Sequence, residues 1–189
     1  MKVLALSRHP GQLISAPPAL EIIVDSATVS VPRPLFLPDF DLEWCVKVYP
    51  AFKISRLGKD IAADFASRYF DSFTAALRLF PNGTNEWLDN KKLPKGVLGI
   101  YDYCLGLGEW HSWSDSDSSI EVNVNGNSLT LTKDMIDIDR VIESVSHYTT
   151  LKTGDVILPC ELPLHLPVQA GNDVKIEIDG FPSFHFKIR

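Results

Sequence analysis

The sequence has few of the features that mark secreted, membrane or nucleic-acid-binding proteins. Its three cysteines are odd in number and share no metal-type spacing, so we expect reduced thiols rather than disulfides or a zinc site. No apolar run is long enough to cross a bilayer. Acidic residues outnumber basic ones by 24 to 18, and there is no basic patch with interleaved aromatic residues. We therefore expect a cytoplasmic protein that binds neither nucleic acid nor membrane.

What the chain does contain is typical of a globular protein with many turns. Hydrophobic residues make up 45% of its 189 residues, enough for a substantial core, and 13 prolines and 11 glycines break the pattern into short segments. We expect a single domain over residues 1–189. Residues 1–39 would supply N-terminal strands and a proline-rich linker, and residues 40–189 would supply the core.

The hydrophobic pattern predicts a mostly β protein with about two helices. The Asn125-Gly126 pair between two alternating runs indicates a hairpin, and an apolar stripe over residues 137–147 indicates a helix. In residues 60–79 an apolar residue recurs every four positions, which fits one long helix or a helix that gives way to a strand near Tyr69. The polar stretch 82–96 suggests a surface excursion. Strands are predicted at 2–8, 20–24, 40–48, 103–110, 120–124, 128–131, 155–158, 173–178 and 184–188.

Two acidic residues stand out in the predicted strand 40–48. Successive strand side chains point to opposite faces, so Asp41 and Glu43 would share one face with their Cβ atoms about 7 Å apart. Both carboxylates could then reach one hard cation. The plainer interpretation is that they are two solvent-facing acids on an amphipathic strand.

Two C-terminal segments, residues 148–158 and 171–180, resemble the C-terminal signature of the fumarylacetoacetate hydrolase family. Five further segments are similar to the family's elements in the same order, so the resemblance covers nearly the whole chain. It implies an α+β, mostly β fold, a mixed β-roll like the C-terminal domain of that family, commonly dimeric. The five segments are 2–8, 40–48, 58–78, 101–108 and 133–135.

The resemblance also implies a chemistry. Members of the family cleave, hydrate, decarboxylate or tautomerise small 2-oxo and 1,3-dioxo acids at a Mg²⁺, Mn²⁺ or Ca²⁺ site. The cation chelates the substrate's oxygens and stabilises the enolate that forms. The family pattern requires a Glu-x-Glu pair on one strand, an Asp on the next strand, a Lys before a Phe-Asp segment, and a Thr-Gly-Thr-Pro loop.

Several of these positions are altered in this chain. Asp41 and Glu43 match the Glu-x-Glu pair, but the Asp of the next strand falls on Arg78, which is itself a cation. The family's Lys falls on Gly99. The substrate loop reads Pro-Cys-Glu-Leu over residues 159–162, so its glycine is lost and its proline offers no N–H.

These changes lead to the hypothesis of a catalytically degenerate relative, a pseudoenzyme. Arg78 would ion-pair with Asp41 and Glu43 and occupy the third ligand position of a remnant metal site, so we expect no cofactor. Shifting the register to make Asp71 the third ligand would break the similarity on both sides.

Two alternatives remain open. The first is an active hydrolase, isomerase or tautomerase of oxo acids with a rebuilt site, which would use Mg²⁺ or Mn²⁺ and draw its acid and base groups from Glu161, His165 and His111. The second is a non-catalytic subunit of an intact family enzyme. The resemblance implies a homodimer or a heterodimer with a relative, and a small organic acid as the possible ligand.

Overall fold

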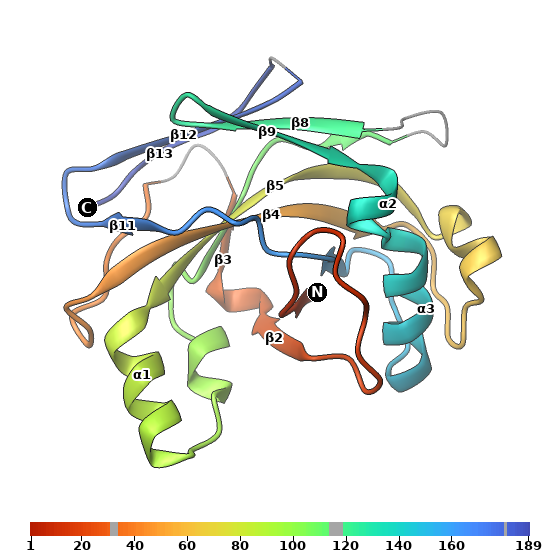
Figure 1. Cartoon of the computed structure of the whole chain (residues 1–189), viewed down its shortest axis with the longest axis horizontal. Helices are drawn as coiled ribbons and strands as arrows, with labels where there is room; N and C mark the ends of the chain where they lie inside the picture. The colour runs from red at the N-terminus through yellow and green to blue at the C-terminus, as the bar shows by residue number, and fades with distance from the viewer. Residues whose placement is uncertain (31–33, 114–118, 180) are drawn as a thin grey trace.

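The computed structural model describes the chain apart from residues 31–33, 114–118 and 180. The described residues form two β-sheets with short helices around them, which confirms the predicted mostly β, mixed-sheet fold (Figure 1). The strands are β1 (Lys2–Leu6), β2 (Leu20–Val24), β3 (Thr28–Ser30), β4 (Trp44–Ile54), β5 (Phe70–Pro81), β6 (Leu105–Leu107), β7 (His111–Ser112), β8 (Ser119–Val124), β9 (Asn127–Thr132), β10 (Val156–Leu158), β11 (Leu166–Val168), β12 (Asp173–Ile178) and β13 (Phe181–Lys187). The helices are α1 (Asn82–Lys91), α2 (Lys133–Ile136) and α3 (Ile138–Tyr148), with 3₁₀ turns η1 (Asp25–Ala27), η2 (Ala63–Arg68) and η3 (Gly96–Gly99).

The larger sheet mixes parallel and antiparallel pairs. Its strand order is β2-β1-β10-β4-β5-β6-β3, with β11 also paired to β4 and β7 to β5. The pairs β1–β10 and β3–β6 are parallel, and the other strands pair antiparallel. The N-terminal strands are therefore part of this sheet, and β1 lies between β2 and β10.

The smaller sheet is antiparallel, with the order β13-β12-β8-β9. The predicted hairpin between β8 and β9 is confirmed, and both turn residues, Asn125 and Gly126, have the positive φ that such a two-residue turn requires. Ile120, Val122 and Val124 alternate toward the core and are buried. The turn predicted at Gly180 lies outside the described residues.

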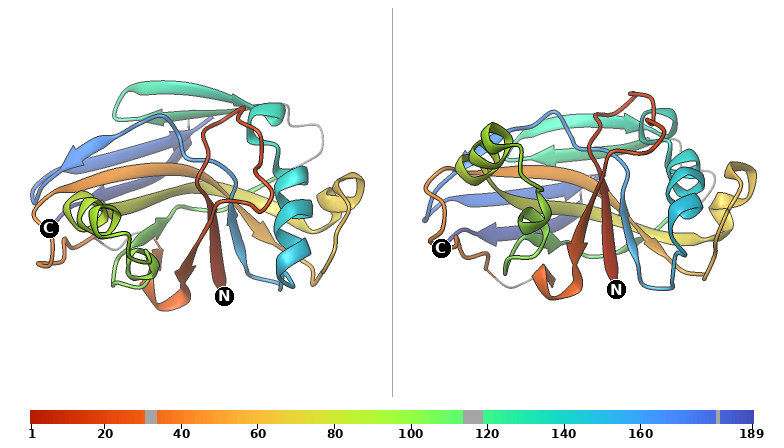
Figure 2. Two further views of the ribbon diagram at one scale, coloured as in Figure 1. Left: turned by 60° about the horizontal axis from the view of Figure 1, so that its bottom comes forward. Right: turned by 90° about the horizontal axis from the view of Figure 1, so that it is seen from below.

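A long antiparallel ribbon of β4 and β5 runs through the larger sheet and separates two environments (Figures 1 and 2). On one face, residues such as Val46 and Leu77 belong to the main core cluster. The opposite face carries small and aromatic residues and two cations, since Lys47 lies directly across from Arg78 in the ladder. Because side chains alternate along a strand, Cys45 and Tyr49 share the face of Lys47.

The structure decides between the two interpretations of residues 60–79. It is not one long helix: the short turn η2 ends at Arg68 and the strand β5 begins at Phe70. Residues four apart lie on one face of a strand as well as of a helix, so Phe73 and Leu77 satisfied both patterns. Their burial in the core favours the strand.

One prediction at the start of β4 was wrong. The strand begins only at Trp44, so Asp41 and Glu43 precede it and do not share a strand face. Residues 82–91, predicted as part of a surface excursion, do lie largely at the surface but form the helix α1. Leu88 is the buried residue of α1, so this helix has no apolar stripe to reveal it.

The predicted late helix is confirmed. It corresponds to α3, whose buried residues Ile138, Val141, Ile142 and Val145 form the expected stripe. Within the described ranges, no helix is both long and apolar enough to cross a membrane.

Candidate functional site

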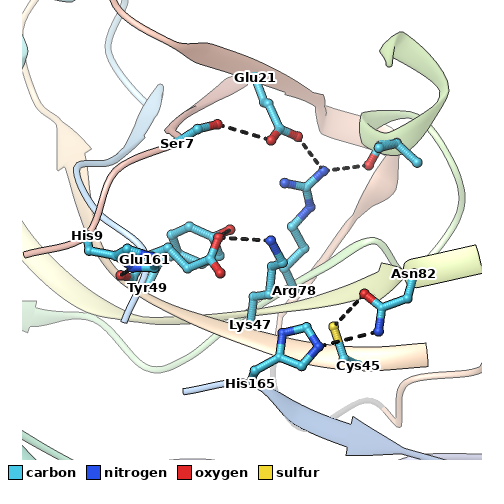
Figure 3. A network of polar contacts seen from close by, with 11 residues as sticks. Ser7, His9, Glu21, Cys45, Lys47, Tyr49, Arg78, Asn82, Glu161 and His165 are labelled. Carbon is cyan, nitrogen blue, oxygen red and sulfur yellow. Dashed lines mark hydrogen bonds and ion pairs between the residues drawn. The ribbon is translucent and has the colours of Figure 1, made fainter. Parts of the chain in front are cut away.

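Arg78 is the centre of a polar cluster on the second face of the β4–β5 ribbon (Figure 3). Its side chain is only 1% exposed, yet it carries a full positive charge. Its Nη2 atom lies 2.8 Å from Glu21 Oε2 on β2 and donates to the carbonyl oxygen of Leu98, also at 2.8 Å. Within the described part of the chain, its Nε has no hydrogen-bond partner. Arg78 thus joins β5 to β2 and to η3.

A second ion pair lies beside the first. Lys47 Nζ is 3.0 Å from Glu161 Oε2, and the Tyr49 hydroxyl donates to the same oxygen at 2.9 Å. The ammonium of Lys47 also lies 4.0 Å from the centre of the Phe80 ring, within cation–π range. Lys47 and Tyr49, two residues apart on one strand face, therefore hold a single carboxylate from the loop after β10.

The electrostatics of the cluster favour fixed charges. Burial disfavours ionisation of Glu21, but the Arg78 guanidinium and the hydrogen bond from Ser7 outweigh it and lower the pKa of Glu21. Burial raises the pKa of Tyr49 well above its usual value, so its hydroxyl stays protonated and acts as a donor. The pKa of Arg78 is raised because the attraction of Glu21 exceeds the cost of burial.

The loop over residues 159–162, where the resemblance expects a substrate loop, is anchored by its backbone. Arg8 Nε donates to the Pro159 carbonyl at 2.8 Å, and the Glu161 N–H donates to the Arg8 carbonyl at 2.8 Å. Cys160 is fully buried, and burial raises its pKa to about 12. These contacts leave the Glu161 side chain pointing at Lys47.

A polar chain at the edge of the cluster includes one of the predicted histidines. Cys45 Sγ donates to Asn82 Oδ1 at 3.4 Å, and the Asn82 amide nitrogen lies 3.4 Å from His165 Nε2. Burial raises the pKa of Cys45 to about 11, so its thiol is not activated. In Figure 3 the dashed line from His165 leads to Asn82 and not to Lys47 or Glu161.

The predicted ion pair of Arg78 with Asp41 and Glu43 is wrong. Arg78 pairs with Glu21, whereas the Asp41 carboxylate accepts hydrogen bonds from the backbone N–H groups of Glu43, at 2.8 Å, and Thr84, at 2.5 Å. These bonds hold the pKa of Asp41 below its usual value against the opposing effect of burial. Asp41 therefore caps the N-terminus of α1, and Glu43 is exposed.

Two other predicted site residues, Glu161 and His111, do not lie beside Asp41 and Glu43. Glu161 joins the cluster, but on Lys47 rather than near Asp41 and Glu43. His111 lies on β7 opposite Phe73, five residues and about 17 Å along β5 from Arg78, so it is not part of the cluster.

Gly99, at the position where the resemblance places a catalytic lysine, lies against the backbone of β2. A Cβ atom at Gly99 would overlap the carbonyl oxygen of Ile22. A side chain at this position would therefore require the adjacent strand β2 to shift.

Among the comparisons with known proteins, only the one with solved structures gave matches. No protein-family model and no curated protein sequence matches the chain. Solved structures match over its full length. A fumarylpyruvate hydrolase from Pseudomonas aeruginosa, solved with Mn²⁺ and pyruvate, superposes with a TM-score of 0.83 at 16% identity, covering 100% of this chain and 90% of that chain. The chain has the fumarylacetoacetate hydrolase fold.

Two further structures show the same fumarylacetoacetate hydrolase (FAH) fold. A candidate member of the family from Yersinia pestis gives a TM-score of 0.85 at 20% identity, covering 100% of this chain and 92% of the other. A 5-carboxymethyl-2-hydroxymuconate delta-isomerase from Mycobacterium smegmatis gives 0.82 at 22% identity, with coverages of 99% and 78%. The resemblance seen in the sequence is thus confirmed as a likeness of fold.

The residues at the expected metal position do not fit a divalent cation. If Arg78 stands where the resemblance expects an aspartate, the strand residues facing it are Lys47 and its same-face neighbour Tyr49. An ammonium and a guanidinium have no lone pair to donate, and Tyr49 keeps its proton. Among the described residues, no group of three or more His, Cys, Asp or Glu side chains is arranged to hold a metal ion.

Sequence reasoning missed Glu21, Lys47 and Tyr49. Lys47 and Tyr49 could have been recognised from the sequence, because they are two residues apart on the strand that precedes Arg78. Glu21 gave no such signal, since β2 approaches Arg78 only through the sheet topology and η3.

Proposed function

We propose that this chain is a catalytically degenerate relative of the FAH-fold enzymes, in which two ion pairs have replaced a divalent-metal centre. The observation that carries the proposal is the pairing of Lys47 with Arg78 across β4 and β5, each bound to a carboxylate from another segment. Two monovalent cations supply the same charge as one divalent ion. The fold can therefore keep its acidic neighbours neutralised without metal.

The replacement preserves charge but not chemistry. A divalent cation accepts both oxygens of an oxo acid into open coordination positions and polarises the carbonyl. Lys47 and Arg78 can only donate hydrogen bonds, and Lys47 Nζ and Arg78 Nη2 already serve Glu161, Glu21 and the Leu98 carbonyl. An oxo acid that approached these two atoms would have to compete with those partners.

Calorimetric titration with Mn²⁺ and Mg²⁺, with and without pyruvate, tests this proposal. We expect no binding in the micromolar range and no pyruvate binding that depends on Mn²⁺. Micromolar binding that is lost in a Glu21→Gln/Glu161→Gln variant would contradict the proposal. Binding lost instead in an Asp41→Ala/Glu43→Ala variant would place a metal at the N-terminus of α1.

A gain-of-binding experiment tests the assignment of positions. Because Lys47, Tyr49 and Arg78 face one another, the triple variant Lys47→Glu/Tyr49→Glu/Arg78→Asp should bind Mn²⁺, with electron paramagnetic resonance of the free ion as the readout. The matched control is Arg78→Asp alone, which keeps the Lys47 ammonium. We expect metal binding by the triple variant only.

A second candidate is a metal-independent acid–base enzyme, favoured by the position of one carboxylate. Glu161 lies between Lys47 and Tyr49 in a largely buried site, where a carboxylate could remove a proton next to a carbonyl. Deuterium exchange at the methyl group of pyruvate, followed by NMR, separates the two candidates. Degeneracy predicts exchange at the buffer rate, whereas an active base predicts faster exchange that Glu161→Gln abolishes.

A further inference from the structure

A small basic groove lies around the C-terminal end of β13. It has a volume of about 230 Å³ and is lined by Pro34, His185, Lys187 and Arg189. In all the views this end of the chain lies at the side of the molecule opposite α3 (Figures 1 and 2). The groove shares no residue with the ion-pair cluster of Figure 3. It is therefore a second place on the molecule where positive charge gathers.

The alternation of side chains along β13 puts the three basic residues on one face. They alternate with buried residues, so all three side chains point toward solvent, with neighbours about 7 Å apart along the strand. The buried residues are Phe184, Phe186 and Ile188. This concentration of positive charge runs against the composition of the chain, whose net charge is −6. The groove is thus a local reversal of the overall charge.

Hydrogen bonds on both sides fix the backbone that carries these side chains. On one side, the Leu35 N–H donates to the Lys187 carbonyl at 3.1 Å, and the Arg189 N–H donates to the Leu35 carbonyl at 2.9 Å. On the other side, the Ile188 N–H donates to the Asn172 carbonyl at 2.9 Å. The basic side chains therefore project from a strand end that is held between two neighbouring segments.

The positive charges of the groove are only partly balanced. Asp173 on β12 lies directly across from Lys187 in the ladder, but its Oδ1 atom lies 3.3 Å from the Nε2 atom of His185. Within the part of the chain that the structure describes, neither Lys187 nor Arg189 has an ion-pair partner. Lys175, across from His185 on β12, adds a further cation. Two fully charged side chains of the groove are therefore available to an anion.

We propose that this groove binds a small anion that carries a phosphate group. The guanidinium of Arg189 can bind two phosphate oxygens through parallel N–H donors, and the ammonium of Lys187 can bind the third. A phosphate dianion suits this arrangement better than a single carboxylate, because it offers three terminal oxygens and up to two charges. The groove is smaller than the roughly 300–1,000 Å³ of typical drug-sized pockets, which favours a phosphate monoester of a small molecule. No residue of the Lys47–Arg78 cluster takes part, so the inference does not depend on the proposed loss of metal.

His185 makes this binding depend on pH. Its Nε2 atom faces the Asp173 carboxylate, so the neutral ring carries its proton there, and its Nδ1 atom is an acceptor that offers no hydrogen bond to an anion. A protonated ring adds a donor at Nδ1 and one more positive charge. The charged groups that face the ring are Asp173 and Lys175 from β12 and Lys187 from β13 itself. Affinity for a dianion should therefore rise as the pH is lowered from about 8 to about 5, the range in which histidine side chains change charge.

Titration with inorganic phosphate tests the site. Amide NMR spectra recorded at constant ionic strength, with chloride as the reference anion, should show saturable shifts centred on residues 185–189, with a Kd of about 0.1–5 mM. The double variant Lys187→Gln/Arg189→Gln should bind phosphate at least about tenfold more weakly, because it loses the charge-assisted hydrogen bonds. Both residues are exposed, so the circular dichroism spectrum of this variant should match that of the wild type.

A matched control separates this site from the loss of positive charge as such. Arg56→Gln/Lys152→Gln removes one arginine and one lysine from two other exposed positions and should leave phosphate binding unchanged. Titration with sulfate, which stays a dianion over this pH range, should show the rise in affinity at low pH. His185→Gln should abolish that rise.

Three results would each overturn the proposal: phosphate shifts that do not saturate, equal weakening in the two double variants, or tighter binding of malonate than of phosphate. A sulfate affinity of the wild type that does not change with pH would contradict the role assigned to His185.

Discussion

The buried Arg78–Glu21 pair gives the most direct prediction about stability. Replacing Glu21 by Gln keeps the size of the side chain but removes the charge that balances a guanidinium only 1% exposed. Removing one partner of a buried ion pair typically costs about 3–5 kcal/mol, because the other charge stays buried without compensation. Since Glu21 itself is 32% exposed, water screens part of the pair. We therefore expect a loss of about 2–3 kcal/mol in the free energy of unfolding.

The double variant Glu21→Gln/Arg78→Met decides whether the pair is the cause. Once the guanidinium is replaced by an apolar side chain, neither charge of this pair remains, so the double variant should lie within about 1 kcal/mol of the wild type. Urea unfolding followed by circular dichroism gives the free energies of the wild type, the single variants Glu21→Gln and Arg78→Met, and the double variant. For a chain of this size the single Glu21 variant should melt about 4–12 °C lower. Glu21→Gln within about 0.5 kcal/mol of the wild type, or additive losses in the double variant, would refute this account.

Three further predictions concern residues around the site. The pKa of Asp155 is lowered, since the hydrogen bonds from Lys2 and Lys152 outweigh burial. Its carboxylate thus stabilises the fold above a pH of about 4, and this is lost as the pH falls through the lowered pKa. Asp155→Asn should cost about 1–2 kcal/mol at pH 7 and flatten the loss of stability in acid, and an unchanged acid titration would contradict this. Asp41→Ala should cost about 1 kcal/mol in urea unfolding through loss of the helix cap, and a neutral result would argue against capping. Gly99→Ala should cost about 1–3 kcal/mol, because its Cβ meets the Ile22 carbonyl, and an unchanged melting temperature would exclude that contact.

Much of the fold could be predicted from the sequence because its strands follow the period of two. The β8–β9 hairpin was predicted by Asn125-Gly126, whose positive φ angles few other residue pairs adopt readily. The segment before β5 was ambiguous for a geometric reason, since a spacing of four satisfies both a strand and a helix. Helix α1 could not be predicted from apolar periodicity, because Leu88 is its buried residue.

The site was harder to predict because it depends on register and on distant segments. Asp41 and Glu43 have the right spacing for a pair on one strand face. However, the Asp41 carboxylate binds backbone N–H groups, and β4 begins only at Trp44, after both residues. The pairing of Lys47 with Arg78 is set by the β4–β5 ladder, whose strands are joined by a long connection rather than a tight turn. The sequence drew attention to Arg78 but not to its partner, Glu21.

The contact between η3 and β2 also bears on how such a chain could change over evolutionary time. Gly99 fits only because its hydrogen leaves room for the Ile22 carbonyl oxygen, so a lysine cannot be introduced there while β2 keeps its place. A long side chain at this position would therefore require a shift of β2, the strand whose Glu21 neutralises Arg78. A change at Gly99 is thus coupled to the Arg78–Glu21 ion pair.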